Sequence, residues 1–173
     1  ETANKENTNN IINAFNSNEL KDTINASFSE EKARTPFLDM HNCTYEEIKN
    51  HYAIRCTKID DKFHIADHKK IDDLSEMIAY FCHKYYEVFQ EHHPVLSDRS
   101  LERVFINFCF PSEFLYDNGI ITLDCYKDMI DRYFTTEYGK YNLSGIKSDY
   151  SISHFMSDEI LINLCKNTFG IPY

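Results

Sequence analysis

A long apolar stripe with the period of an α-helix constrains this chain more than any other feature. Between residues 68 and 91, apolar side chains recur so that they fall along one face of a helix. They are Ile71, Leu74, Ile78, Phe81, Cys82, Tyr85, Val88 and Phe89. Polar and charged side chains occupy the other side, and Pro94 stops the helix. A helix with one apolar face needs neighbours that cover it, so the stripe predicts a packed core.

Local start and stop signals predict further helices and no convincing pair of strands. Thr44 and Glu47 have the spacing of a capping box, which begins a helix that extends to about residue 59. The other helices are expected over residues 97–110, 122–139 and 153–167, with loops at 111–121 and 140–152. Only four Gly and four Pro are present, which disfavours a turn-dense β-sandwich or barrel. The fold class predicted is therefore all-α, a single compact bundle of five to six helices, linked by disulfides.

Composition divides the chain into an arm and a helical domain. Residues 1–36 are rich in Asn, Glu and Ser and allow one weakly amphipathic helix, which Thr35-Pro36 ends. Residues 37–173 carry the strong helical signals and are long enough to bury a core of their own. We expect the arm either to dock one helix on the domain or to fray, and a partner-binding arm is the alternative.

Six scattered cysteines bear on the compartment in which the protein works. They are Cys43, Cys56, Cys82, Cys109, Cys125 and Cys165. An even number of cysteines favours disulfides and an extracytoplasmic protein, although fifteen pairings are possible and the spacing selects none of them. No Cys-x-x-Cys pair is present, so the spacing does not indicate a zinc site. Because four of the six lie on or beside apolar stripes, reduced and buried thiols in a reducing compartment are the alternative.

Three sequons agree with secretion without establishing it. Asn25, Asn42 and Asn142 each begin an Asn-x-Ser/Thr sequence and are the glycosylation candidates. A chain so rich in asparagine is expected to contain roughly two such sequences by chance. The sequons therefore add little weight of their own to the extracellular interpretation.

The net charge of −10 excludes several classes of partner. Binding to nucleic acid through phosphate contacts needs a basic face, and binding to anionic lipid needs basic clusters. The densest basic pair is Lys69-Lys70, and no stretch approaches the roughly 20 apolar residues that span a bilayer. We therefore expect no nucleic acid and no membrane insertion in this sequence. An acidic surface instead suits a basic protein partner.

No pattern in the sequence indicates catalysis, a cofactor or a metal. The chain lacks a Gly-rich phosphate loop, Gly-x-Ser-x-Gly, His-Glu-x-x-His and a kinase signature. His64 and His68 have the spacing of a metal-binding pair on one helix, but Asp67-His68 reads as a helix start, which separates them. The protein is therefore predicted not to be an enzyme and to hold no cofactor.

The function expected from these features is a protein–protein interaction module. The cysteines favour a secreted or surface-exposed factor, located outside the cell or on its surface. The abundance of Asn, Lys, Ile, Tyr and Asp is typical of AT-rich genomes and is consistent with a parasite or virus as its source. Exposed aromatic side chains would form its binding face. The candidates are Tyr85, Tyr86, Tyr138, Tyr141 and Tyr150, although for each of them packing in a core or at its rim is the favoured interpretation.

Two alternatives stay open. Glu113 to Gly119 resembles the BH1 region of Bcl-2-like proteins, although the Trp-Gly-Arg that follows in that family is absent and Thr122-Leu123-Asp124 lies there instead. The resemblance implies an intracellular, cytoplasmic helical adaptor or regulator with reduced cysteines, and it assigns no role to any residue. The other alternative is a carrier of a small apolar ligand, enclosed by a core rich in Phe and Tyr.

Overall fold

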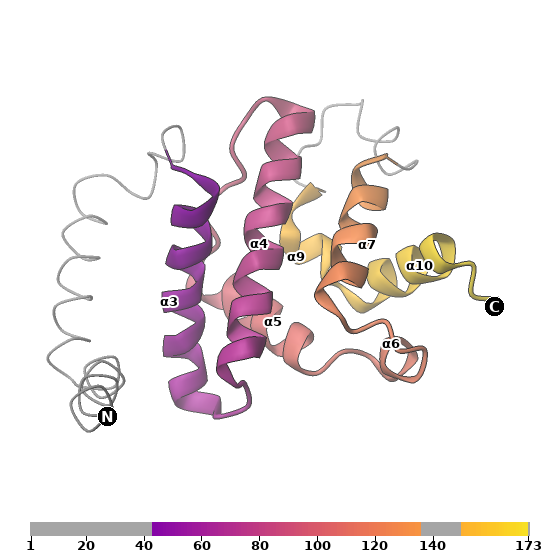
Figure 1. Cartoon of the computed structure of the whole chain (residues 1–173), viewed down its shortest axis with the longest axis horizontal. Coiled ribbons are helices and arrows are strands. Elements are labelled where there is room, and N and C mark those ends of the chain that lie inside the picture. The colour runs from indigo at the N-terminus through magenta and orange to yellow at the C-terminus, as the bar shows by residue number, and fades with distance from the viewer. Residues whose placement is uncertain (1–42, 136–149, 173) are drawn as a thin grey trace, which may run out of the picture. The chain divides into compact units, whose positions relative to one another are not determined.

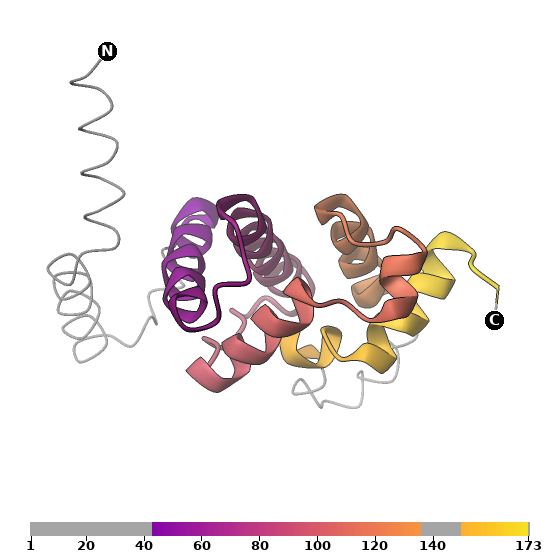
Figure 2. The same cartoon turned by 90° about the horizontal axis from the view of Figure 1, so that it is seen from below.

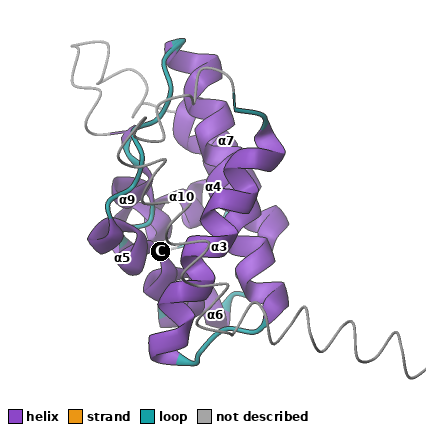
Figure 3. Cartoon of the chain, turned by 90° about the vertical axis from the view of Figure 1, so that its left-hand side faces the viewer, coloured by secondary structure: helices purple, strands orange, loops and turns teal. Residues whose placement is uncertain are grey.

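Helices joined by turns and short loops make up the fold (Figure 1). The structure is a computed structural model that describes residues 43–135 and 150–172. Within these ranges there is no strand, and Figure 3 shows only helices and loops. The helices are α3 (Tyr45–Phe63), α4 (His68–Phe89), α5 (Asp98–Cys109), α6 (Glu113–Asp117), α7 (Leu123–Thr135), α9 (Ile152–Phe155) and α10 (Asp158–Phe169). The all-α prediction is confirmed, and the expected N-terminal arm lies outside the described residues.

Two layers of helices enclose the core. Helices α3, α4 and α7 lie side by side with α4 between the other two, and α4 packs against both (Figure 1). Seen from below, α5, α9 and α10 form a second layer across them (Figure 2). Helix α5 contacts α3, α4 and α9, and α10 contacts α6, α7 and α9. The apolar stripe of α4 is thus covered from several sides, as its sequence requires.

The helix ends follow the capping signals in the sequence. The Thr44 hydroxyl accepts a hydrogen bond from the Glu47 amide at 3.2 Å, and the Glu47 carboxylate accepts one from the Thr44 amide at 2.9 Å. This reciprocal pair confirms the capping box. The Asp67 side chain caps α4 through the Lys70 amide at 2.7 Å. His64 ends α3 in the left-handed region with φ 51°, so it lies outside the helix that His68 begins.

A cluster of aromatic rings fills the space between the two layers. Phe81 is fully buried at its centre, with ring centroids 5.0 Å from Phe134 and 5.5 Å from Phe155. The other rings within the cluster belong to Tyr85, Phe89, His93, Tyr133 and Tyr150. Burial of large rings is among the strongest contributions to a core. This cluster joins α4, α7, α9 and the connection between α4 and α5.

His93 fixes that connection from inside the core. Its ring is 3% exposed, its Nδ1 lies 2.7 Å from the Pro94 carbonyl oxygen, and its Nε2 lies 3.1 Å from the Ile152 amide nitrogen. The amide can only donate, so Nε2 accepts and Nδ1 carries the proton that it donates to Pro94. Burial disfavours the charged imidazolium and lowers the pKa of His93 to about 4. His93 therefore serves the fold as a neutral ring with both nitrogens bonded.

The segment expected as a loop over residues 111–121 contains a short helix. Helix α6 is five residues long, and Leu115 is its one fully buried side chain. The chain leaves α6 through Gly119, whose φ of 69° is readily available to glycine, and the Ile120 amide then donates to the Leu115 carbonyl at 2.9 Å. A single helical turn is too short to show a period in the sequence, so the pattern alone misses it.

Candidate protein-binding surface

The tyrosines predicted to bind a partner differ in their exposure. Tyr85 is 4% exposed and Tyr150 1% exposed, so both lie in the core and neither is presented to a partner in this fold. Tyr86 is exposed, and its ring stacks on His92 with centroids 4.6 Å apart. Tyr138 and Tyr141 lie outside the described residues. Of the five candidates, Tyr86 is thus the one that the described surface presents.

The expected disulfide linkage is not found. None of the six cysteines forms a disulfide, and Cys56, Cys82 and Cys165 are buried in the core. In such surroundings a thiol packs as a small apolar side chain. Burial disfavours the thiolate and raises the pKa of both Cys56 and Cys82 to about 12. The structure therefore corrects the prediction of a disulfide-linked bundle, because apolar packing accounts for the inward positions of these cysteines.

This arrangement predicts how the six thiols react with iodoacetamide. In the native protein at pH 8, Cys56, Cys82 and Cys165 are expected to resist alkylation because they are buried. For Cys56 and Cys82, a pKa near 12 also leaves only about one thiol in ten thousand ionised, and burial raises the pKa of Cys165 as well. In denaturant without reductant, all six are expected to react. The intact mass after alkylation, with and without prior reduction, gives the number of thiols that react in the native and in the denatured protein. A cysteine that reacts only after reduction would contradict the thiol assignment.

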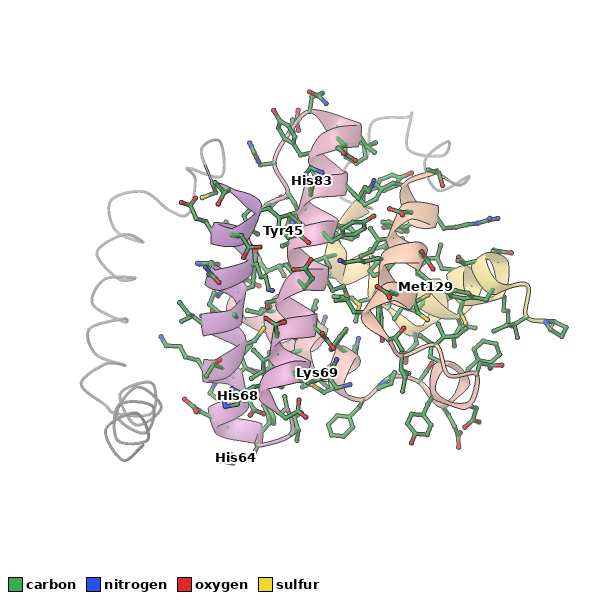
Figure 4. The ribbon with its side chains drawn as sticks, viewed as in Figure 1. Tyr45, His64, His68, Lys69, His83 and Met129 are labelled. Atoms are coloured by element: carbon green, nitrogen blue, oxygen red, sulfur yellow. The ribbon has the colours of Figure 1, made fainter. Side chains whose placement is uncertain are left out.

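The remaining candidates from the sequence are the three sequons and the two histidines at metal-binding spacing. Asn25, Asn42 and Asn142 lie outside the described residues. His64 and His68 lie on opposite sides of the turn between α3 and α4 (Figure 4). In the part of the chain that the structure describes, no three side chains of His, Cys, Asp or Glu are arranged to hold a metal ion.

A network of ion pairs on α3, α4 and α7 has a structural role. The Glu76 carboxylate accepts a hydrogen bond from the Tyr45 hydroxyl at 2.7 Å and pairs with Lys127 at 3.2 Å and Lys49 at 3.4 Å. Tyr45 lies between α3 and α4 (Figure 4). Burial alone raises the pKa of Glu76, but the Tyr45 hydrogen bond and the lysines outweigh it, so the pKa lies below its usual range. Tyr45 and Lys49 belong to α3, Glu76 to α4 and Lys127 to α7, so the network joins three helices.

Phe110 and Tyr116 are the most exposed large apolar side chains of the described residues. They are 61% and 64% exposed, respectively. Phe110 caps the end of α5, where Pro111 stops the helix. Tyr116 follows buried Leu115 on α6, and successive helical side chains point about 100° apart, which turns Tyr116 outward. The sequence analysis did not select either residue. The available signal was their position near Pro111 and Gly119, where helices end and an apolar side chain is not part of an amphipathic stripe.

Two carboxylates accompany these aromatic rings. Glu113 lies three residues before Tyr116 and four before Asp117, so its side chain neighbours both of them on the helical surface. Glu113 and Asp117 are exposed and form no ion pair with any residue that the structure describes. We call the exposed side chains of Phe110, Glu113, Tyr116 and Asp117 the α6 surface. It combines aromatic area with negative charge.

The ring beside this surface already carries a cation. Phe114, half-buried on α6, has the Lys166 ammonium 5.3 Å from its ring centroid. Such a contact is favourable because a cation is attracted to the negative face of an aromatic ring. No comparable contact is made by Phe110 or Tyr116 within the described ranges. The α6 surface thus presents rings and carboxylates that the described fold does not use.

None of the helices in the described ranges is both long enough and apolar enough to cross a bilayer. No protein family, no curated protein and no solved structure matches this chain.

Proposed function

We propose that the helical domain is a non-enzymatic protein-binding module and that its partner docks on the α6 surface. The observation that carries this proposal is the exposure of Phe110 and Tyr116 beside a well-packed core. Large aromatic side chains are enriched among the residues that dominate binding energy at protein interfaces. In the isolated domain these side chains remain in contact with water. A partner that covered them would gain the free energy of burying their apolar surface.

The dimensions of the surface support the same proposal. Tyr116 lies six positions after Phe110, so their Cα atoms are at most about 22 Å apart even in a fully extended chain. A standard interface buries about 800 Å² on each partner, which corresponds to a patch about 32 Å across. The distance between the two Cα atoms therefore does not exceed the width of one such patch.

The nature of the polar side chains supports a binding role over a catalytic one. His93 is neutral with both ring nitrogens bonded, and Tyr133 bonds His154 Nδ1 at 2.7 Å. Burial raises the pKa of Cys56 and Cys82 and so opposes the thiolate that nucleophilic catalysis needs. These groups act in the fold, which leaves the α6 surface as the better candidate for function.

The cysteines also bear on the compartment. Buried thiols that pack as apolar side chains support the intracellular, reducing alternative over the secreted factor. We therefore propose an intracellular helical adaptor, and the alkylation measurement above decides between the two, since disulfides would favour the secreted factor.

A selection from a random peptide library displayed on phage tests the binding role. Peptides selected on the wild-type protein are expected to bind the Tyr116→Ala variant at least about tenfold more weakly, the loss typical of a hot-spot tyrosine. Tyr86→Ala is the matched control, because it removes the same atoms from an exposed site on α4, and it is expected to bind as the wild type does. Failure to select any peptide, or equal losses in both variants, would count against the proposal.

A further inference from the structure

The fold contains its own example of how this chain holds ammonium groups. The ring of Tyr80 on α4 has Lys84 5.6 Å and Lys127 5.2 Å from its centroid. Each lysine also reaches a carboxylate, with Lys84 3.6 Å from Asp131 and Lys127 3.2 Å from Glu76. An aromatic face and a neighbouring carboxylate therefore act together, because both attract the same positive charge.

The α6 surface offers the same two groups without the cation. Tyr116 supplies an exposed ring, and Glu113 lies one helical turn before it and neighbours Asp117 as well. No described lysine, arginine or histidine pairs with either carboxylate. Phe114, on the same helix as Tyr116, already has the Lys166 ammonium of α10 over its ring. The ring of Tyr116 has no such cation among the described residues.

We infer that the α6 surface takes a cationic and apolar segment of a protein partner, with a lysine or arginine side chain over Tyr116 between Glu113 and Asp117. This inference rests on the proposed binding function and names the chemistry of the partner. The apolar part of the segment covers Phe110, whose side chain is 61% exposed. The net charge of −10 adds a long-range attraction for a basic partner.

Charge also argues against a second copy of this chain as the occupant. A symmetric dimer places the same patch on both subunits, so Glu113 and Asp117 would approach their own counterparts. Like charges brought together at an interface oppose association. Self-association through the α6 surface is therefore disfavoured, whereas a basic segment from another protein is attracted.

Two synthetic amphipathic peptides of 16 residues test the inference on the full chain. They share the same leucine positions and differ only in having lysine or glutamate at every polar position. The lysine peptide is expected to bind more tightly, and its affinity is expected to fall as salt rises from 50 to 300 mM, because exposed charge attraction is screened. Equal affinity for the two peptides would overturn the inference.

Charge-neutral variants locate the attraction on α6. The double variant Glu113→Gln and Asp117→Asn is expected to bind the lysine peptide about fivefold more weakly, which is the scale of one or two exposed charge contacts. Glu46→Gln removes a charge from exposed α3 and is expected to leave the affinity unchanged. An equal affinity in the double variant and in this control would overturn the proposed contact.

Substitutions of Tyr116 separate the cation contact from simple apolar area. Tyr116→Phe keeps the aromatic face and is expected to retain affinity for the lysine peptide, whereas Tyr116→Leu keeps apolar area and is expected to lose about threefold or more. If phage-selected peptides depend on Tyr116 but are indifferent to the carboxylates, the binding function stands and the cationic partner is rejected. If sedimentation shows a dimer that Tyr116→Ala abolishes, the occupant is a second copy and the inference fails.

Discussion

Replacing Phe81 by alanine is expected to lower the free energy of unfolding by about 3 to 5 kcal/mol. The side chain is fully buried and its ring contacts those of His93, Tyr133, Phe134 and Phe155. Its removal leaves a cavity where both layers of helices meet, and the surrounding rings are too constrained to fill it. Urea unfolding followed by circular dichroism measures the loss.

The same substitution at Phe110 is the matched control for that experiment. Phe110→Ala removes identical atoms from an exposed position and is expected to change the free energy of unfolding by no more than about 0.5 kcal/mol. A loss at Phe110 as large as the loss at Phe81 would show that Phe110 serves the core, and it would remove the main support for the α6 surface.

Acidification is expected to destabilise the protein between pH 6.5 and pH 4 through His93. In the unfolded chain the imidazole binds a proton below about pH 6.5, whereas burial holds the folded pKa at about 4. The stabilisation is therefore fully present above pH 6.5 and is lost as the pH falls through this window. A difference of about 2.5 pKa units corresponds to about 3 kcal/mol at the low end.

Protonation of His51 at low pH also lowers the stability of the folded protein. Burial, with a smaller effect of the Arg55 charge, lowers its pKa to about 3, so the wild type resists taking up two protons on acidification. His93→Gln removes one of these titrations, and the difference in unfolding free energy between pH 7 and pH 4.5 is expected to shrink by about 2 to 3 kcal/mol. A pH dependence in His93→Gln equal to that of the wild type would contradict the role of His93.

Much of the helical structure follows from short-range signals, which is why the sequence predicts it. The capping box at Thr44 and the stripe of α4 depend on residues within a few turns of one another, and both are found as expected except that Val88, near the end of the stripe, is 48% exposed. Helix α6 is not predicted from the sequence because five residues are too few to show a helical period. Its ends depend on Gly119 and on packing against α10, which is distant in the sequence.

The candidate site was less predictable, because exposure depends on the whole fold. Tyr85 and Tyr86 are adjacent in the sequence, yet about 100° of helix rotation places the first in the aromatic cluster and the second on the surface. The stripe places Tyr85 on the inward face of α4, so the prediction that Tyr85 binds a partner conflicts with the helical pattern and is wrong in this fold. Burial of the cysteines likewise depends on contacts between distant helices, and their number alone cannot distinguish packed thiols from disulfides.

Mapping the bound peptide on the protein tests the proposed function most directly. Backbone amide chemical shifts of the isotope-labelled protein are recorded by NMR as the tightest phage-selected peptide is added. Binding at the α6 surface predicts that the largest shifts fall between Phe110 and Asp117 and in the neighbouring turn of α10 around Lys166. Largest shifts around Tyr86 and Val88, with residues 110–117 unchanged, would contradict the assignment of the binding site to α6.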